Sequence, residues 1–404
     1  MISATRTIAL IPWFQFLNSL LFWQAVWFLY FQSNLSGAEA IILYSVYDIS
    51  VTVLEVPSGY FSDRIGRRFT LLLSTLCSLL GCLVLALSGS FALFALGQAL
   101  LGAGSAFKSG TDSSLLYESL EAAGRADEVE EQEVRAWRFS LVGFALSAIF
   151  GGAMSMWSDS LPFFATALAF AIAALLVFAM SEPPRKAMEA LRGQLATLKT
   201  ALLHPVLAWL FTLSVLMYGF SHLPFVFGQP FILTALEGWG LAADAPLVSG
   251  AITSAMMLTS VLASLAALRL RHALGLPLLL LCAFGLQIAL IGALATSTST
   301  LIIGVLLLRI VPDSLANPFI LARIQPLLED GTRATYLSLK SLGGKVLFAG
   351  TLILAATTAS DAGLLPADDL QRILGWYTVG GLICIAALAV TARWVQIAPP
   401  QKTE

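Results

Sequence analysis

Ionisable side chains inside long apolar stretches are the residues of this sequence that are best placed to do chemistry. Asp48 lies nine residues into an apolar stretch that begins near residue 39, which corresponds to about 13 Å along a helix. A charge within hydrocarbon costs about 2.5 to 3.5 kcal/mol, so such a residue needs a reason to be there. We expect Asp48 to bind a proton or a polar solute. A carboxyl group that is hydrogen-bonded for packing alone is the alternative.

The second half of the sequence carries four more ionisable candidates. Arg309 and Asp313 are four residues apart, so their side chains can pair on one helix face. Lys345 lies deep in another apolar stretch, and if it and Arg309 face a cavity they favour an anionic or zwitterionic ligand. His222 can titrate near neutral pH, although a histidine that donates one hydrogen bond within a packed helix explains it equally well.

Polar side chains also interrupt the first apolar stretch, at Gln15, Asn18 and Gln24. We expect them to line a cavity for an amphipathic ligand, because such cavities combine apolar walls with a few polar groups. Trp13 and Trp27 are expected to act as anchors at the membrane surfaces.

The composition indicates which elements must position these groups. Apolar residues make up 58% of the 404 residues, charged residues only 11%, and the mean hydropathy is +0.85, whereas a soluble domain contains about 25% charged residues. Because about 20 residues cross a bilayer, we expect an all-α polytopic membrane protein with twelve transmembrane helices. They are predicted near 8–31, 39–61, 70–88, 91–117, 135–156, 161–181, 206–235, 246–268, 275–295, 300–326, 335–359 and 371–394. The four cysteines all lie inside these stretches, so we expect reduced packing residues.

The basic residues predict the orientation of these helices, because Lys and Arg accumulate in short cytoplasmic loops. With both termini inside, the cytoplasmic side receives seventeen of the twenty-two Lys and Arg residues and the outer side only Arg372. Lys108, Arg309, Lys340 and Lys345 fall within the predicted helices, and we expect Lys340 to reach the headgroups with its long side chain.

A compact charged turn separates the second and third apolar stretches. It reads Gly59-Tyr-Phe-Ser-Asp63-Arg64-Ile-Gly66-Arg67-Arg68. Glycine at 59 allows two helices to approach closely, Asp63 can cap a neighbouring helix start, and the arginines lie where lipid headgroups begin. This turn resembles the signature loop of the major facilitator superfamily, G-x-x-x-D-R-x-G-R-R.

The resemblance implies two pseudo-symmetric six-helix bundles, 1–181 and 206–404, joined by a cytoplasmic linker, 182–205. It also implies a monomeric secondary transporter of the bacterial inner membrane that works by alternating access, with proton-coupled efflux of a small amphipathic molecule as its commonest activity. Uptake of a metabolite and movement of a lipid-like molecule are the alternatives. A sensor that keeps the fold without transport is a further one.

Two positions depart from patterns of that family. Gln98 stands four residues before Gly102, where proton-coupled members usually have arginine, and Ser147-Ala148 stands before Gly151-Gly152, where the antiporter branch has Gly-Pro. The stretches 54–59 and 109–120 look like those of a poorly characterised bacterial subgroup. In the second half, residues 266–275 keep bases and a glycine of the signature but no acid.

Acidic residues near the charged turn extend the predicted inner gate. We expect Glu55 to join Asp63 and Arg67 in charge pairs that form in one state and break in the other, and Glu118 to reach Arg67 or Arg68. Asp112 is included in this gate, with a local pair to Lys108 as the simpler interpretation. The acidic run from Glu118 to Glu133 either holds basic residues of the opposite half or is a solvated helix end.

The linker carries leucines at spacings of three and four between residues 188 and 202, which predicts an amphipathic helix on the inner membrane surface. A flexible connection is the alternative. No nucleotide-binding G-x-x-x-x-G-K-[ST] and no H-E-x-x-H occurs, and the three histidines are scattered. We therefore expect no enzyme, cofactor or metal site. The expected partners are a small-molecule substrate, protons and the lipid bilayer, and not nucleic acid.

Overall fold

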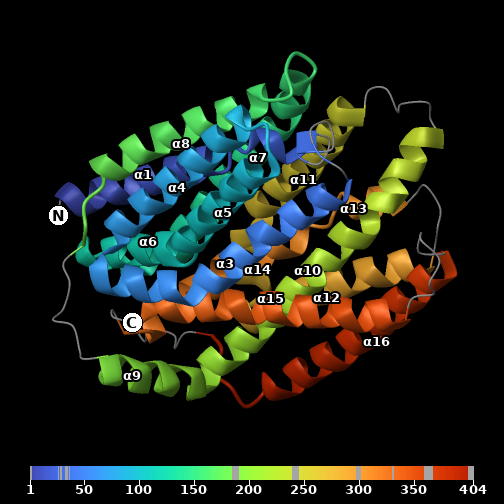
Figure 1. Cartoon of the computed structure of the whole chain (residues 1–404). Coiled ribbons are helices and arrows are strands. Elements are labelled where there is room, and N and C mark those ends of the chain that lie inside the picture. The colour runs from blue at the N-terminus through green and yellow to red at the C-terminus, as the bar shows by residue number, and fades with distance from the viewer. Residues whose placement is uncertain are drawn as a thin grey trace. The chain divides into compact units, whose positions relative to one another are not determined.

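The structure is a computed structural model, and it is helical throughout the part that it describes (Figure 1). That part comprises residues 2–25, 27, 30–31, 35, 37–183, 191–238, 245–296, 302–329, 332–358 and 367–398. The prediction of an all-α polytopic protein is confirmed. Each of the twelve predicted ranges contains a described helix.

The chain divides into two compact units. Unit 1 comprises Met1–Lys199, Asp244–Leu258 and Leu328–Leu342, and unit 2 comprises Thr200–Ala243, Thr259–Leu327 and Gly343–Glu404. The boundary at residue 199 lies inside the predicted linker, while two segments of the second half belong to unit 1. The predicted pair of six-helix bundles is a different division, based on pseudo-symmetry, and it stays a prediction.

Unit 1 is a bundle in which α4 packs against α5 and α8, α3 against α5, and α1 against α7. Its elements are α1 (Ile2–Asn18), η1 (Phe22–Ala25), α3 (Gly37–Ile65), α4 (Arg67–Leu87), α5 (Phe91–Lys108), α6 (Thr111–Ala122), η2 (Ala126–Glu128), α7 (Val129–Ser155) and α8 (Leu161–Ala179). The unit also contains the first part of α11 (Ala245–Leu274) and of α15 (Arg333–Thr358). We call residues 333–342 the α15 start.

Unit 2 is organised around α12 (Leu276–Thr296), which contacts α10 (Pro205–Gly238), α14 (Val311–Ile324) and α16 (Ala367–Thr391). The unit further contains α13 (Ile302–Leu306), η4 (Gln325–Leu327) and the later parts of α11 and α15. Phe220 of α10 meets Phe284 of α12 edge-on, with ring centroids 5.4 Å apart. The linker helix is α9 (Leu191–Leu203), and residues 184–190 before it lie outside the described part.

Eight helical segments in the described part are long and apolar enough to cross a membrane. The number rises to nine if the two helices that meet in a bend at His204 are counted as one span.

Two predicted spans are each broken into two helices. Gly110, with φ of +72°, separates α5 from α6, and Pro312 lies in the first turn of α14, after the turn that follows α13. Pro312 has no N–H group to donate to the carbonyl oxygen of Leu308, which interrupts the helical hydrogen bonds at the second break.

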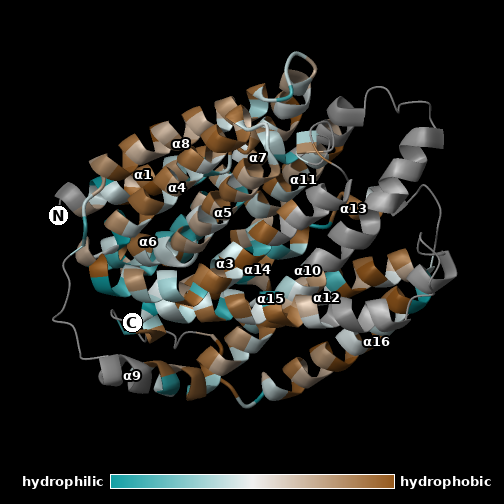
Figure 2. Ribbon diagram, viewed as in Figure 1, coloured by the Kyte–Doolittle hydropathy of each residue, from teal (hydrophilic) through white to brown (hydrophobic). Residues whose placement is uncertain are grey.

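The exposed face of unit 1 is strongly apolar. On α8, Phe164, Leu168, Ile172 and Leu175 recur at spacings of four, four and three residues and are all exposed. Figure 2 shows hydrophobic residues along the length of α4 and α8. A stripe of this kind on a polytopic helix suits contact with lipid chains, because it would be costly in water.

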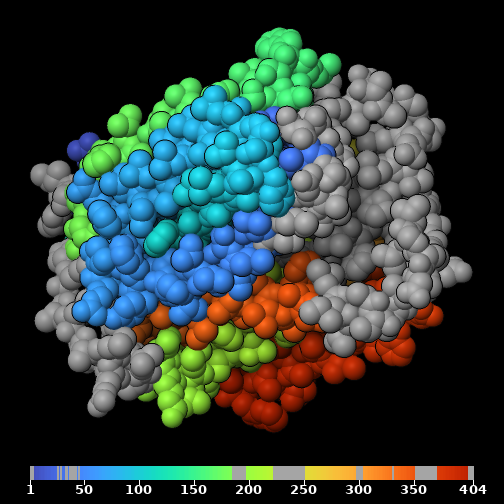
Figure 3. Space-filling view, viewed as in Figure 1, coloured from blue at the N-terminus to red at the C-terminus, as the bar shows by residue number. Residues whose placement is uncertain are grey.

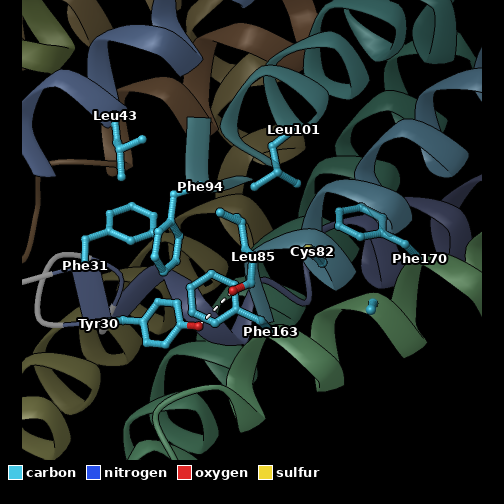
Figure 4. Close-up of a cluster of buried hydrophobic side chains, with 10 residues drawn as sticks. Tyr30, Phe31, Leu43, Cys82, Leu85, Phe94, Leu101, Phe163 and Phe170 are labelled. Carbon is cyan, nitrogen blue, oxygen red and sulfur yellow. Dashed lines mark hydrogen bonds between the residues drawn. The ribbon is translucent and has the colours of Figure 1, made fainter. Parts of the chain in front are cut away.

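Small residues allow the helices of unit 1 to pack closely. A Cβ atom on Gly81 of α4 would lie 2.9 Å from the carbonyl oxygen of Gly97 on α5, so the two backbones are nearly in contact. The side chains of α4 and α5 form one continuous surface in the space-filling view (Figure 3). An aromatic cluster fills the adjacent core, where Tyr30 packs against Phe94 and Phe163 and donates a hydrogen bond of 2.8 Å to the carbonyl oxygen of Leu85 (Figure 4).

Candidate functional site

The candidate site is a buried ionic network built on the turn between α3 and α4. Gly66 forms this turn with φ of +139°, a backbone conformation that side chains with a Cβ rarely adopt. The turn lets Arg67 reach back to Asp63, and the two side chains form a hydrogen-bonded ion pair. Asp63 is only 4% exposed and Arg67 only 2%, so the pair is shielded from water and each partner depends on the other.

Asp63 also caps the start of α15, as the sequence analysis expected for a neighbouring helix. Its carboxylate accepts hydrogen bonds from the backbone N–H of Ala334 at 3.1 Å, the backbone N–H of Thr335 at 2.8 Å, and the hydroxyl of Thr335 at 2.5 Å. A negative charge at a helix N-terminus satisfies free N–H groups and complements the helix dipole. Asp63 therefore binds the α15 start to α3.

Gly59 lets this part of α3 approach α15 without a steric clash. A Cβ atom at this position would lie 2.6 Å from Oγ of Ser338 and 2.8 Å from the carbonyl oxygen of Ala334. Both distances are shorter than real Cβ contacts, so glycine is needed for the close approach that brings Asp63 to the helix start.

Glu118 of α6 extends the network in the other direction. It accepts hydrogen bonds from Nε of Arg67 at 3.1 Å and from its NH2 group at 2.8 Å, and lies 3.7 Å from the guanidinium of Arg333. Arg333, at the first position of α15, is 3% exposed and lies over the ring of Tyr117 at 4.6 Å. The charges thus alternate along Asp63, Arg67, Glu118 and Arg333, which reduces the cost of burying them.

A second set of contacts fixes the beginning of α4 on the end of α8. The carboxylate of Glu182 accepts the backbone N–H groups of Arg67 and Arg68, both at 2.8 Å. The guanidinium of Arg68 donates to the carbonyl oxygens of Val177 at 3.1 Å and Phe178 at 2.7 Å, at the end of α8. An acid at the start of a helix and a base at its end are both stabilising, because each charge is opposite in sign to that end of the helix dipole. Arg64 is exposed and donates to the hydroxyl of Tyr60 at 2.7 Å.

Two residues of the predicted gate make separate contacts. Glu55 is fully buried but receives its hydrogen bond from the hydroxyl of Ser109, and it precedes Asp63 by eight residues, or about 12 Å along α3. Asp112 accepts a hydrogen bond of 2.7 Å from Nε2 of Gln15 and lies 3.9 Å from Nζ of Lys108, as the local-pair interpretation expected. The ionic network therefore uses Asp63, Arg67 and Glu118 from the predicted set.

The predicted cavity residues are less closely grouped. Asp48 is exposed on α3, Gln24 is exposed in η1, and Gln15 and Asn18 are half-buried on α1. The hydrogen bond from Gln15 to Asp112 links α1 to α6. Their roles in binding a solute or a proton stay predictions.

A smaller polar cluster lies in unit 2. Asp313, in the first turn of α14, accepts a hydrogen bond of 3.2 Å from Nε2 of Gln287 on α12 and interacts electrostatically with Arg309. Gln287 is 2% exposed, and its Oε1 has no hydrogen-bond partner in the described part of the chain. Lys345 is half-buried on α15. His222 falls within α10, but its side chain lies outside the described part.

Sequence reasoning did not select Arg333, Glu182 or Gln287 as site residues. Arg333 counted only as one of many cytoplasmic bases, and Glu182 as part of the linker. No pattern in the sequence distinguishes a base that stabilises a helix end from one that meets a buried acid. Among the described residues, no group of three or more His, Cys, Asp or Glu side chains is arranged to hold a metal ion.

Comparisons with known proteins agree with this architecture. Residues 8–118 match the sequence model of the family described as Major Facilitator Superfamily. The fold is similar to that of the human organic anion transporter MFSD10, with 16% identity, a TM-score of 0.71, and coverage of 95% of this chain and 99% of that one. It is also similar to the E. coli fucose:proton symporter FucP, with 16% identity, a TM-score of 0.64 and coverage of 98% of each chain.

A bacterial homologue of the iron transporter ferroportin, in an outward-facing state, is similar in fold as well. Its identity is 15% and its TM-score 0.71, and the match covers 96% of this chain and 99% of that chain. No curated protein sequence matches this one. The sequence match is confined to residues 8–118, whereas the similarity in fold extends over nearly the whole chain, so this chain has the fold of Major Facilitator Superfamily transporters.

Proposed function

We propose that this protein moves a small amphipathic molecule across the cytoplasmic membrane by alternating access, as a proton-coupled efflux transporter. The observation that carries the proposal is the buried network of Asp63, Arg67, Glu118 and Arg333, which holds the α15 start against α3 and α6 within unit 1. Contacts of this kind suit a gate that is closed in one state and open in the other.

The energetics of the network support a gate with two discrete states. Removing one partner from a buried ion pair costs about 3–5 kcal/mol, because the other charge is left without compensation. When a gate opens, water enters and hydrates the separated groups, so the open state does not carry that cost. A partial opening would break the pairs without hydrating them, and it is therefore disfavoured.

The cationic groups of unit 2 support an anionic or zwitterionic substrate. Arg309 and Lys345 are both half-buried in helical, largely apolar surroundings. Arginine in particular recognises carboxylate and phosphate groups through charge-assisted hydrogen bonds. MFSD10, whose fold is similar, is described as an organic anion transporter.

The proton coupling in this proposal uses Asp48 as the first candidate and Asp313 as the second. A ligand can shift the equilibrium between two states only by binding them with different affinities. A proton that favours one state and a substrate that favours the other would couple the two gradients. The inside orientation of both termini and efflux as the direction follow from the distribution of bases and from the sequence resemblance.

Flux measurements with purified protein in proteoliposomes test the proposal. The probe is a dansylated amino acid, which is an amphipathic anion, and an uncharged dansyl amide serves as the comparison. We expect the anion to move against its gradient when a pH difference is imposed, and to stop when a protonophore removes that difference. Asp48→Asn should abolish the response to pH while exchange of the probe across the membrane persists.

Two results would count against the proposal in different ways. If no tested solute moves faster than in empty liposomes, and no solute in a thermal-shift panel stabilises the protein, the transporter assignment loses its support in favour of a sensor. If the anion moves down its gradient at equal rates with and without a pH difference, the coupling part is wrong. Movement driven in the opposite direction would indicate uptake.

A further inference from the structure

The amide of Gln287 uses only one of its two hydrogen-bonding groups. Gln287 lies in α12, a helix without charged residues, and is 2% exposed. Its Nε2 donates a hydrogen bond of 3.2 Å to Oδ1 of Asp313, whereas its Oε1 has no partner in the described part of the chain. A buried acceptor without a donor has lost its hydration and gained nothing in return. A donor that reaches this oxygen would therefore stabilise the site.

Asp313 is the more accessible partner of this pair. It is half-buried in the first turn of α14, directly after the turn that separates α13 from α14. The side chain of Gln287 reaches it from α12, which packs against α14 within unit 2. A carboxyl group that can be reached and a fully buried amide are thus in direct contact.

The charged surroundings of Asp313 are simple. Arg309 lies four residues earlier, in the turn before α14, and attracts the Asp313 carboxylate. A helix start also favours a negative charge. The described side chains of α10, α12 and η4, which pack against α14, include no charged group. The titratable residues of α10 are Tyr218, His222 and Glu237, and the side chains of the last two lie outside the described part.

An amide can pair with a carboxyl group in either protonation state. A carboxylate only accepts hydrogen bonds, and Nε2 of Gln287 supplies one to Asp313. A protonated carboxyl group has an O–H to donate, and Oε1 of Gln287 is available to accept it. The two amide atoms are bonded to the same carbon, so rotation about the last side-chain bond of Gln287 can exchange their positions.

We propose that Asp313 and Gln287 form a proton site, in which the acid binds one proton and the amide positions it in both protonation states. One proton from solution adds to the Asp313 carboxylate as an O–H bond, which donates to Oε1 of Gln287. Release of the proton returns the carboxylate to Nε2. The charge of Arg309 favours the released state, so movement of its turn relative to α14 links the proton to the conformation. The inference rests on the proposed proton coupling and gives Gln287 a positioning role in it.

Infrared difference spectra between acidic and alkaline pH test the site in full-length protein. We expect the parent to show a carbonyl band of a protonated carboxylic acid that is lost in Asp313→Asn. In Gln287→Leu the band should shift to higher frequency, because the O–H no longer donates to an amide oxygen. A role of Gln287 in packing alone would not move it. Gln98→Leu, which removes another buried glutamine from α5 of unit 1, is the matched control and should keep the parent band.

A double-mutant cycle measures the contact itself. Asp313→Asn imitates the protonated acid, because its N–H group can donate to Oε1 and its oxygen can accept from Nε2. Asp313→Leu can form neither hydrogen bond. We expect Gln287→Leu to lower the thermal unfolding temperature by several degrees in the Asp313→Asn background, and to raise it or leave it unchanged in the Asp313→Leu background. The band shift in Gln287→Leu stays measurable if either Asp313 variant does not fold.

Three results would overturn the proton site. They are a parent band that persists in Asp313→Asn, an unchanged band frequency in Gln287→Leu, and equal effects of Gln287→Leu in the two backgrounds of the cycle. Neither measurement uses a transported solute. Absence of flux therefore removes the proposed function and leaves this site intact, whereas flux driven by pH without the Asp313 band overturns this site alone.

Discussion

Two polar regions of this protein satisfy their buried groups to very different extents. Around the turn between α3 and α4, Asp63, Arg67, Glu118 and Arg333 alternate in charge and are joined by several hydrogen bonds. In unit 2, Asp313 receives a hydrogen bond from Gln287, whose buried Oε1 has no partner in the described part of the chain. In the first region, each of these four charged side chains lies next to a side chain of opposite charge. The second leaves an acceptor available, as a site that binds something else would.

Removal of Arg67 should have the largest effect and would test the first half of this comparison. Arg67→Met keeps much of the aliphatic volume but leaves Asp63 and Glu118 buried without their shared cation. We expect a loss of about 3–5 kcal/mol in the free energy of unfolding, measured by denaturant titration in detergent. Arg64→Met, at an exposed position in the same turn, is the matched control and should change little. If Arg67→Met lowers the free energy of unfolding no more than Arg64→Met does, the network does not stabilise the fold.

Replacement of Glu182 should have a smaller effect, because it removes a helix cap and not a buried pair. Glu182→Gln keeps one acceptor oxygen, so only one of the N–H groups of Arg67 and Arg68 retains its partner, and the negative charge is lost. We expect a loss of about 1 kcal/mol, read as a lower thermal unfolding temperature. Glu121→Gln, at an exposed position, provides the baseline. If the two variants are equally stable, the contact between α4 and α8 does not depend on this charge.

The smallest effect on stability is expected in unit 2. Gln287→Leu removes both the donor to Asp313 and the unpartnered Oε1, two changes of opposite sign that should nearly cancel, within about 1 kcal/mol. Its effect should appear in function instead, as a weaker response of flux to pH or a changed preference for the dansyl anion. A large loss of stability with unchanged flux would assign Gln287 a packing role and remove the contrast between the two regions.

The sequence predicted the helical architecture and part of the site. Apolar stretches of about 20 residues have few structural alternatives, which explains why all twelve ranges contain helices. The capping role of Asp63 was predictable because a short acid next to a glycine turn commonly binds a helix start. The sequence did not predict which helix start it would be, since Asp63 and Thr335 are separated by 272 residues.

Other parts of the site depend on tertiary packing that no local pattern records. Glu133 has the same charged neighbours in sequence as Glu131, yet one is buried and the other exposed. The difference arises because Glu133 packs on α6, where the hydroxyl of Ser113 donates a hydrogen bond to it. Glu55 was predicted to join Asp63 and Arg67 in the gate, and this stays a prediction; the structure adds a hydrogen bond to Glu55 from the hydroxyl of Ser109, which the sequence did not indicate. Gly110 and Pro312 can be read from the sequence, but the sequence did not indicate that helices end at Gly110 and before Pro312.

A reversible cross-link of the α15 start tests the central claim most directly. The hydroxyl of Ser338 lies 3.4 Å from the carbonyl oxygen of Ser109, so Ser109→Cys with Ser338→Cys places two thiols across the proposed gate. In a background without the native cysteines, we predict that oxidation to the disulfide stops flux of the dansylated amino acid and that reduction restores it. Undiminished flux in fully cross-linked protein would contradict the claim that the α15 start must separate from α3 and α6 during transport.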